Sequence, residues 1–145
     1  MAPRITIIGG GSYQWVPKLL VDVANTPVLH EAEIVLEDLD PAPLPRMVAL
    51  VEQIAELRGL GITARSTTDQ REALDGADYV VVNISTGGFE SMRHDLEIPA
   101  RYGIRQSVGD TVGPGGILRS LRNIPVLTSI AVSYTHLRAH ETGRN

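Results

Sequence analysis

Short apolar runs alternate with helix-like segments along the first 83 residues. Four runs fit strands buried in a sheet, being rich in β-branched residues: Ile5–Ile8, Glu33–Glu37, Ile62–Ser66 and Tyr79–Asn83. Between them apolar positions recur with a near-helical period, most clearly over Leu44–Arg58, and Gly59 and Gly61 stop that helix. This alternation predicts an α/β fold with a parallel sheet and right-handed crossover helices.

Three further helices are predicted with less periodicity. A helix follows the first strand near Trp15, with Pro17 in its first turn, where proline is tolerated. Asp69 is placed to cap a short helix that ends at Leu74, before Gly76. A third helix is predicted over Ile117–Ile130.

The first apolar run ends in a glycine cluster, since residues 5–12 read ITIIGGGS. Glycines at the end of a buried strand allow a sharp turn and a close approach of the backbone to a phosphate. The following helix directs its N-terminal amides and dipole at the same anion. The pattern therefore predicts a nucleotide pyrophosphate at this turn.

A carboxylate follows the second predicted strand. Asp38 comes 29 positions after Gly9, next to the strand end, where a Rossmann unit places the acceptor for the adenosine ribose hydroxyls. Asp40 competes for this role, and Pro41 leaves open that both carboxylates only shape a turn. A carboxylate at the ribose favours NAD over NADP, because it repels the 2′-phosphate.

The segment after the fourth predicted strand, residues 84–95, is predicted as a loop at the carboxyl end of the sheet, where ligands bind in such folds. Thr86 and Gly87 are predicted to border the nicotinamide, and Arg93 to clamp an anionic or hydroxyl-rich substrate. The neighbours His94 and Asp95 suggest a catalytic pair. Adjacent residues rarely converge on one atom, however, and a histidine in a charged stretch is more often solvated or structural.

A second glycine-rich loop, Asp110–Gly116, precedes the last predicted helix. It is interpreted either as a tight turn that enters the helix or as a backbone surface near the cofactor, and the two interpretations are compatible.

Composition narrows the function classes. A chain of 145 residues with 43% hydrophobic residues buries one core, which predicts one domain. A net charge of −4 without a basic stripe argues against nucleic acid or an anionic membrane as a partner. The absence of cysteine excludes disulfides and thiolate metal sites in this chain. No signal peptide or bilayer-spanning run is found, so a cytoplasmic protein is expected.

Four motifs in this order resemble the N-terminal part of glycoside hydrolase family 4: ITIIGGGSYQWVPKLL, LEDLD, NISTGGFESMRHDLEIPARYG and VGDTVGPGGILRSLRNIP. The resemblance runs from about residue 4 to about residue 131. It implies a Rossmann-like fold similar to the N-terminal domain of lactate and malate dehydrogenases. Gln14 stands where the general dinucleotide fingerprint has its third glycine, which fits the G-x-G-S form of this family.

The resemblance also implies an activity that depends on NAD and on a divalent metal such as Mn²⁺. In members of this family the sugar is oxidised at C3, and a base then removes its C2 proton. The aglycone leaves by elimination and water adds, which is an exception to the two-carboxylate rule of glycosidases. It assigns the cofactor to Gly9, Gly11, Ser12 and Asp38, and the sugar to Arg93. The metal ligands and the catalytic base lie beyond this chain, so no catalytic or metal-binding residue is assigned.

A non-phosphorylated α-glycoside is the expected substrate, and a homo-oligomer the expected state of the full-length enzyme. Two other functions stay open on the residues alone. One is an NAD-dependent 2-hydroxy acid dehydrogenase, and the other is a nucleotide-binding module without chemistry. A metal requirement separates the glycosidase from both.

The last residues form a segment of different origin in our interpretation. Residues 132–142, VSYTHLRAHET, match the translation of a transposase sequencing adapter, and 143–145 would come from the index bases that follow it. We therefore expect an incomplete NAD-binding domain over 1–131 and a non-native tail over 132–145, with no helix continuing into the tail. His136 and His140 have the i, i+4 spacing of a zinc pair, but they belong to this tail.

Overall fold

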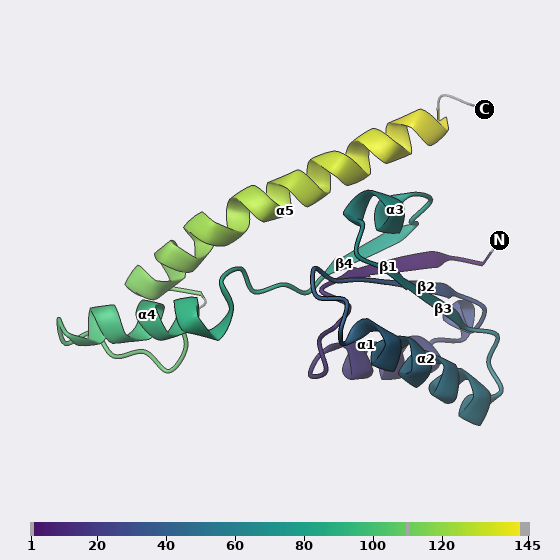
Figure 1. Ribbon diagram of the computed structural model, residues 1–145, viewed down its shortest axis with the longest axis horizontal. Helices are drawn as coiled ribbons and strands as arrows, with labels where there is room; N and C mark the ends of the chain where they lie inside the picture. The colour runs from purple at the N-terminus through teal and green to yellow at the C-terminus, as the bar shows by residue number, and fades with distance from the viewer. Residues whose placement is uncertain (1, 110, 143–145) are drawn as a thin grey trace. The chain divides into compact units, whose positions relative to one another are not determined.

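The computed structural model describes residues 2–109 and 111–142 (Figure 1). The chain divides into two compact units, each described here by itself. The first contains the chain up to Ile84 together with the segment from Ser133 on, and the second is Ser85–Val132.

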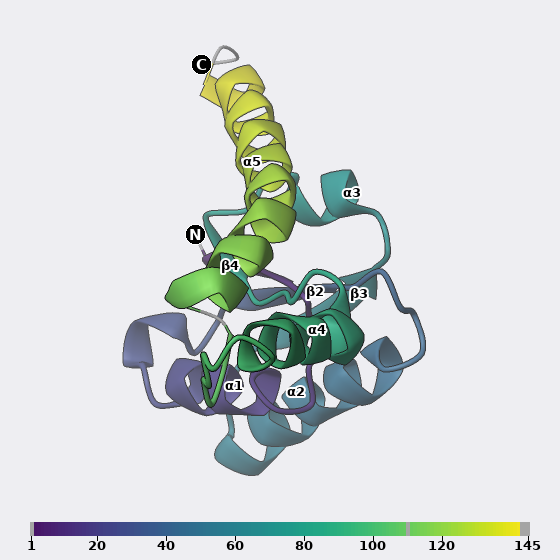
Figure 2. The same cartoon turned by 90° about the vertical axis from the view of Figure 1, so that its left-hand side faces the viewer.

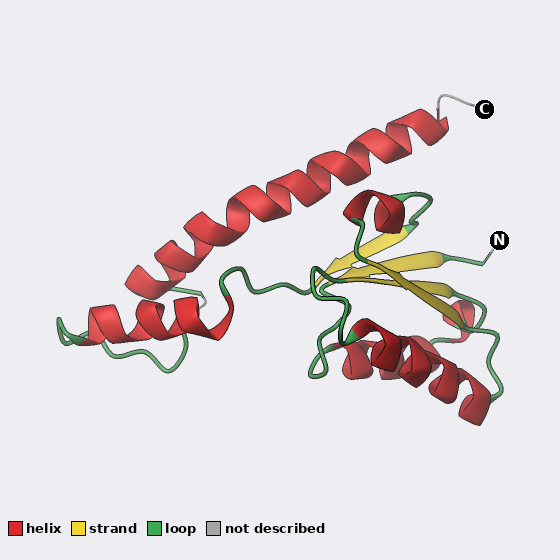
Figure 3. Ribbon diagram, viewed as in Figure 1, coloured by secondary structure: helices red, strands yellow, loops and turns green. Residues whose placement is uncertain are grey.

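A four-stranded parallel sheet forms the centre of the first unit (Figure 3). Its strands are β1 (Arg4–Ile8), β2 (Glu33–Glu37), β3 (Thr63–Thr67) and β4 (Tyr79–Val82). Their order is β3-β2-β1-β4, and each pair is parallel, which confirms the predicted sheet. The third strand begins one residue later than expected, at Thr63.

Two helices cover one face of this sheet. In Figures 1 and 2, α1 (Val16–Ala24) and α2 (Leu44–Arg58) lie side by side on that face. They bury a core with the sheet residues that point toward them: Ile5, Ile7, Ile34 and Leu36. A one-turn 3-10 helix, η1 (Pro27–Leu29), occupies the connection to β2.

Local sequence accounts for the ends of these helices. Pro17 lies in the first turn of α1, and α2 ends where Gly59 adopts a left-handed backbone with φ +62°. On the other face of the sheet, α3 (Gln70–Leu74) is capped by Asp69, whose carboxylate accepts hydrogen bonds from the amides of Arg71 and Glu72. These predicted helices are confirmed.

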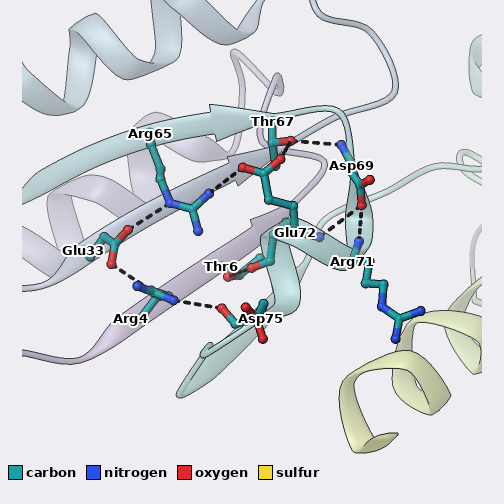
Figure 4. A network of polar contacts seen from close by, with 10 residues as sticks. Arg4, Thr6, Glu33, Arg65, Thr67, Asp69, Arg71, Glu72 and Asp75 are labelled. Carbon is teal, nitrogen blue, oxygen red and sulfur yellow. Dashed lines mark hydrogen bonds and ion pairs between the residues drawn. The ribbon is translucent and has the colours of Figure 1, made fainter. Parts of the chain in front are cut away.

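The face under α3 is polar (Figure 4). The Glu33 carboxylate accepts hydrogen bonds from Arg4 at 2.7 Å and from Arg65 at 2.9 Å. The buried Thr6 hydroxyl donates to the carbonyl of Ala73 at 2.6 Å, which attaches α3 to the centre of the sheet.

The second unit contains α4 (Gly88–Ala100), so the predicted loop over residues 84–95 is wrong from Gly88 on. Gly87, with φ +85°, makes the turn into this helix. A loop was expected from the position after the fourth strand, although Phe89, Met92 and Leu96 have the i, i+3, i+7 spacing of one helix face. Ion pairs between Arg93 and Glu90 or Glu97, one turn away on each side, instead support an exposed helix.

The last helix, α5 (Gly113–Thr142), is longer than the predicted 117–130 and continues through the tail, which corrects the expectation that no helix enters it. An exposed helix needs no apolar stripe, and no glycine or proline interrupts residues 126–142. Tyr134 also donates a hydrogen bond to the Ala77 carbonyl at 3.0 Å. This geometry does not bear on the origin of the tail, which stays a prediction, and residues 143–145 lie outside the described residues. Across the described ranges, no helix is long and apolar enough to cross a membrane.

Candidate functional site

The glycine turn after β1 is held by the backbone of β2. The amides of Gly9 and Gly10 both donate to the Glu37 carbonyl, at 2.8 and 2.7 Å. Gly9 has φ +85°, and a Cβ there would lie 2.0 Å from the carbonyl oxygen of Asn83, just after β4. Only glycine fits this position, so the sequence signal of the turn has a steric cause.

Gly11 and Asp38, predicted separately as cofactor residues, lie together in the structure. The Gly11 amide donates to Asp38 Oδ2 at 2.9 Å. A Cβ on Gly11 would lie 2.5 Å from Cγ of Pro43 and 2.8 Å from the same carboxylate oxygen. The carboxylate at the end of β2 is therefore aimed at the glycine turn.

The competing carboxylate, Asp40, has a different position. It is exposed, and its Oδ1 accepts a hydrogen bond from the Ala42 amide at 3.0 Å, which shapes the turn before α2. Its own amide donates to Asp38 Oδ1 at 3.1 Å. Asp40 thus shapes the turn before α2, while Asp38 is the carboxylate that contacts the glycine turn.

Ser12 closes the glycine turn on the side of α1. Its amide donates to the Gly9 carbonyl at 3.3 Å, and its hydroxyl accepts a hydrogen bond from the Trp15 amide at 3.3 Å. Because α1 begins at Val16, the turn lies at the positive end of a helix dipole. The arrangement suits an anion bound at this turn.

Sequence reasoning missed Glu37 as a titratable group beside this turn. Glu37 is only 4% exposed. Burial raises the pKa of its carboxyl to about 7, and the charges of Asp38 and Asp69 act in the same direction. The available signal was a glutamate at the inner end of an otherwise apolar strand, EIVLE.

In the second unit, α5 binds the backbone of Thr86 on both sides. The Thr86 amide donates to Asn123 Oδ1 at 3.2 Å, and Arg122 Nε donates to the Thr86 carbonyl at 3.4 Å. Neither Arg122 nor Asn123 was singled out from the sequence. Two adjacent polar residues in a helix with many apolar positions were the signal for a contact there.

Arg93 lies on α4 with its side chain about half exposed, between the carboxylates of Glu90 and Glu97 at 2.6 and 3.1 Å. Hydrogen bonds and charge from Glu90, with a smaller contribution from Glu97, raise the pKa of Arg93. His94 contacts Glu90 at 3.3 Å. A sugar bound by Arg93 must compete with these partners, so its role as a clamp stays a prediction.

Asp95, next along the helix, is 1% exposed and has a different partner. Its carboxylate binds the guanidinium of Arg122 through two hydrogen bonds, one of them 3.0 Å long. His94 and Asp95 thus have separate partners, and the described structure does not unite them as a pair.

The second glycine-rich motif packs α5 against α4. A Cβ on Gly115 would lie 2.7 Å from the Asp95 carbonyl oxygen, and one on Gly109, just before the motif, would lie 3.2 Å from Asp95 Cβ. With Gly113 beginning α5 at φ +74°, these contacts account for the motif as a turn and helix entry. Asp110, within this motif, lies outside the described residues.

A search of the part of the chain that the structure describes finds no group of three or more histidine, cysteine, aspartate or glutamate residues that could hold a metal ion.

Comparison with known proteins identifies relatives of similar sequence. An α-galactosidase from Rhizobium meliloti is 40% identical over 124 residues, covering 86% of this chain and 25% of that protein. An α-glucosidase from Erwinia rhapontici is 36% identical, covering 90% and 29%. An α-galacturonidase from Lachnoclostridium phytofermentans is 38% identical, covering 88% and 28%. The chain therefore spans between 25% and 29% of the length of these curated relatives.

Solved structures agree with the sequence matches. The crystal structure of lplD from Bacillus subtilis has a TM-score of 0.76 at 34% identity, covering 93% of this chain and 30% of that one. A 6-phospho-beta glucosidase from Thermotoga maritima, solved with manganese, NAD+ and glucose-6-phosphate, has a TM-score of 0.76 at 26% identity, covering 92% and 31%. The profile described as Family 4 glycosyl hydrolase matches residues 4–138. With that match over most of its length, the chain belongs to glycosyl hydrolase family 4.

Proposed function

We propose that this chain is the N-terminal, NAD-binding part of a longer glycosidase that cleaves an α-glycoside through oxidation at C3 of the sugar, elimination and addition of water. The observation that carries the proposal is the contact of the Gly11 amide with Asp38 at the end of β2. Membership of family 4 favours this function over a 2-hydroxy acid dehydrogenase and over a module without chemistry.

The residues of the first unit fit a dinucleotide. Gly9, Gly11 and Ser12 form a turn in which a side chain at either glycine would collide with its neighbours. Such a turn lets a pyrophosphate approach the backbone, and Asp38 offers the carboxylate for the ribose hydroxyls. When bound, NAD supplies the hydride acceptor for the sugar.

The residues of the second unit are assigned from the sequence. Thr86 and Gly87 are proposed to border the nicotinamide, and Arg93 to hold sugar hydroxyls or an anionic group. We propose that the ligands of a divalent cation such as Mn²⁺ lie in the rest of the longer protein, and we assign none within the described residues.

The names of the sequence relatives support the substrate class. The relatives that are 36–42% identical are named as α-galactosidases, an α-glucosidase and α-galacturonidases, whereas a relative named for 6-phospho-beta-glucosidase is 33% identical. We propose a non-phosphorylated α-glycoside as substrate, with the α-glucoside and α-galacturonide branches as the first to test. A homo-oligomer in the cytoplasm is proposed for the complete enzyme.

The cofactor assignment is tested in the full-length enzyme, with residues 1–131 joined to their genomic continuation. Asp38→Ala is expected to weaken NAD binding by about 1.5–3 kcal/mol, the scale of a hydrogen bond to a charged group. Asp38→Asn retains an acceptor for the Gly11 amide but loses the charge, so it should bind NAD more weakly while gaining affinity for NADP. Asp40→Ala is the matched control. A titration in which Asp40→Ala loses affinity and Asp38→Ala does not would move the ribose role to Asp40.

The activity is tested with two preparations. The 145-residue chain is expected to release no sugar from an α-glycoside, even with NAD and Mn²⁺, because the proposal places the metal ligands and the base in the rest of the longer protein. The completed enzyme should turn over and should stop when the metal is chelated. Turnover of the completed enzyme without metal would contradict the proposed reaction.

A further inference from the structure

We propose that Arg122 and Asn123 are positioning residues that fix the Thr86 peptide for cofactor binding. This inference rests on the proposed function, because it takes the segment around Thr86 and Gly87 as part of the NAD site. The geometry that supports it lies entirely within the second unit.

Both hydrogen-bonding groups of the Thr86 backbone are bound by consecutive residues of α5. Asn123 Oδ1 accepts from the Thr86 amide at 3.2 Å, and Arg122 Nε donates to the Thr86 carbonyl at 3.4 Å. Together these contacts set the planes of the peptide groups on either side of Thr86. They therefore set the directions of the Thr86 Cα–Cβ bond and of the Gly87 amide.

Arg122 is itself held from the opposite side. The Asp95 carboxylate, with its side chain 2% exposed, binds the guanidinium through two oxygens, a planar arrangement that only arginine offers. The Asp95 backbone is packed against Gly115, where a Cβ would lie 2.7 Å from the carbonyl oxygen. The orientation of Arg122 is thereby fixed by the crossing of α4 and α5.

The residues after Thr86 explain why such support is needed. Gly87 and Gly88 both have positive φ, +85° and +57°, and a glycine pair has many alternative conformations. Ordering one residue costs about 1–2 kcal/mol of backbone entropy, which a ligand would otherwise supply on binding. Because α5 already holds Thr86 in the folded chain, part of this entropy is lost on folding and not on cofactor binding.

The test measures NAD dissociation constants and melting temperatures of the full-length enzyme. Asn123→Leu removes the acceptor for the Thr86 amide and should weaken NAD binding by about fivefold to tenfold, the effect of one lost hydrogen bond. Asn123→Asp keeps an acceptor of the same shape and should restore affinity to within about twofold of the wild type. Thr128→Leu, at an exposed position of α5, is the matched control and should bind NAD as the wild type does.

A second variant covers the case in which Asn123→Leu does not fold. Arg122→Lys keeps the charge beside Asp95 but loses the Nε donor to the Thr86 carbonyl, and it should also weaken NAD binding. If Arg122→Lys and Asn123→Leu bind NAD as well as the wild type does, the positioning role is overturned and the proposed function is not. Equal loss in Asn123→Leu and Asn123→Asp overturns it too, since no rescue occurs. A wild type that does not bind NAD overturns the proposed function itself.

Discussion

The two faces of the β-sheet are held together by different forces. On the face covered by α1 and α2, sheet residues such as Ile7, Ile34 and Leu36 are at most 1% exposed and form a continuous apolar core. On the face under α3, the same strands present Arg4 and Glu33 to each other and to further polar partners. Alternation along a strand lets five-residue segments such as RITII serve both faces. One face thus contributes stability by burial, while the other carries groups that titrate.

The largest effect is expected on the apolar face. Leu36→Ala should lower the free energy of unfolding by about 3 kcal/mol, because it removes a fully buried side chain and leaves a cavity. Leu39→Ala, three residues away and 90% exposed, is the matched control and should change little. Urea unfolding of both variants checks this. Equal losses would mean that the apolar face is not the core of the unit.

A smaller effect, with the opposite sign, is expected from Glu37. Its pKa rises from 4.5 to about 7 on folding, so the folded chain retains a proton that the unfolded chain releases. The stability from this proton is complete below pH 4.5 and is lost as the pH rises through 7. Glu37→Gln, which imitates the protonated carboxyl, should therefore be more stable than the wild type at pH 8 by about 2 kcal/mol and equal to it at pH 4.5.

Unfolding curves across this pH range measure the difference, with Glu56→Gln on the exposed side of α2 as the control. A constant difference between Glu37→Gln and the wild type at all pH values would show that Glu37 does not titrate in this way.

The smallest effect is expected at Glu33, on the same strand and the same face. Burial raises the pKa of its carboxyl, but hydrogen bonds and charge from Arg4 and Arg65 more than offset this, and the pKa is lowered. Its stabilisation is present above pH 4.5 and is lost as the pH falls, the reverse of Glu37. Because the group is partly exposed, Glu33→Gln should cost about 0.5 kcal/mol at neutral pH.

Salt separates this contribution from burial. In 1 M NaCl the loss of unfolding free energy in Glu33→Gln should shrink, because the Debye length at this concentration is only about 3 Å. The loss in Leu36→Ala should not change. A Glu33→Gln cost that does not change with salt would indicate a packing role instead.

The apolar face and the glycine turn were predictable from the sequence, because burial and steric exclusion leave local signatures. Gly9 stands at the end of a β-branched run, and Asp38 stands at the end of the next apolar run. The polar face was not predicted. Arg65 and Glu33 meet only because β2 and β3 pair in a particular register, and that register does not follow from either strand alone.

The support of Thr86 was hidden for a similar reason. Arg122 and Asn123 lie more than 30 positions away in a helix, and nothing near Thr86 indicates them. The length of α5 was underestimated because an exposed helix needs no periodic apolar residues.

The order of the strands has a consequence for how the sheet assembles. β1 is made first, yet it lies between β2 and β4. Arg4 bonds to Glu33 and to Asp78, 29 and 74 positions later in the chain. A growing chain can therefore pair one side of β1 early, whereas the other side waits for a closure of much longer range, which is slow. The first strand of this sheet to leave the ribosome thus has one neighbour that follows at once and another that is made after all the other strands.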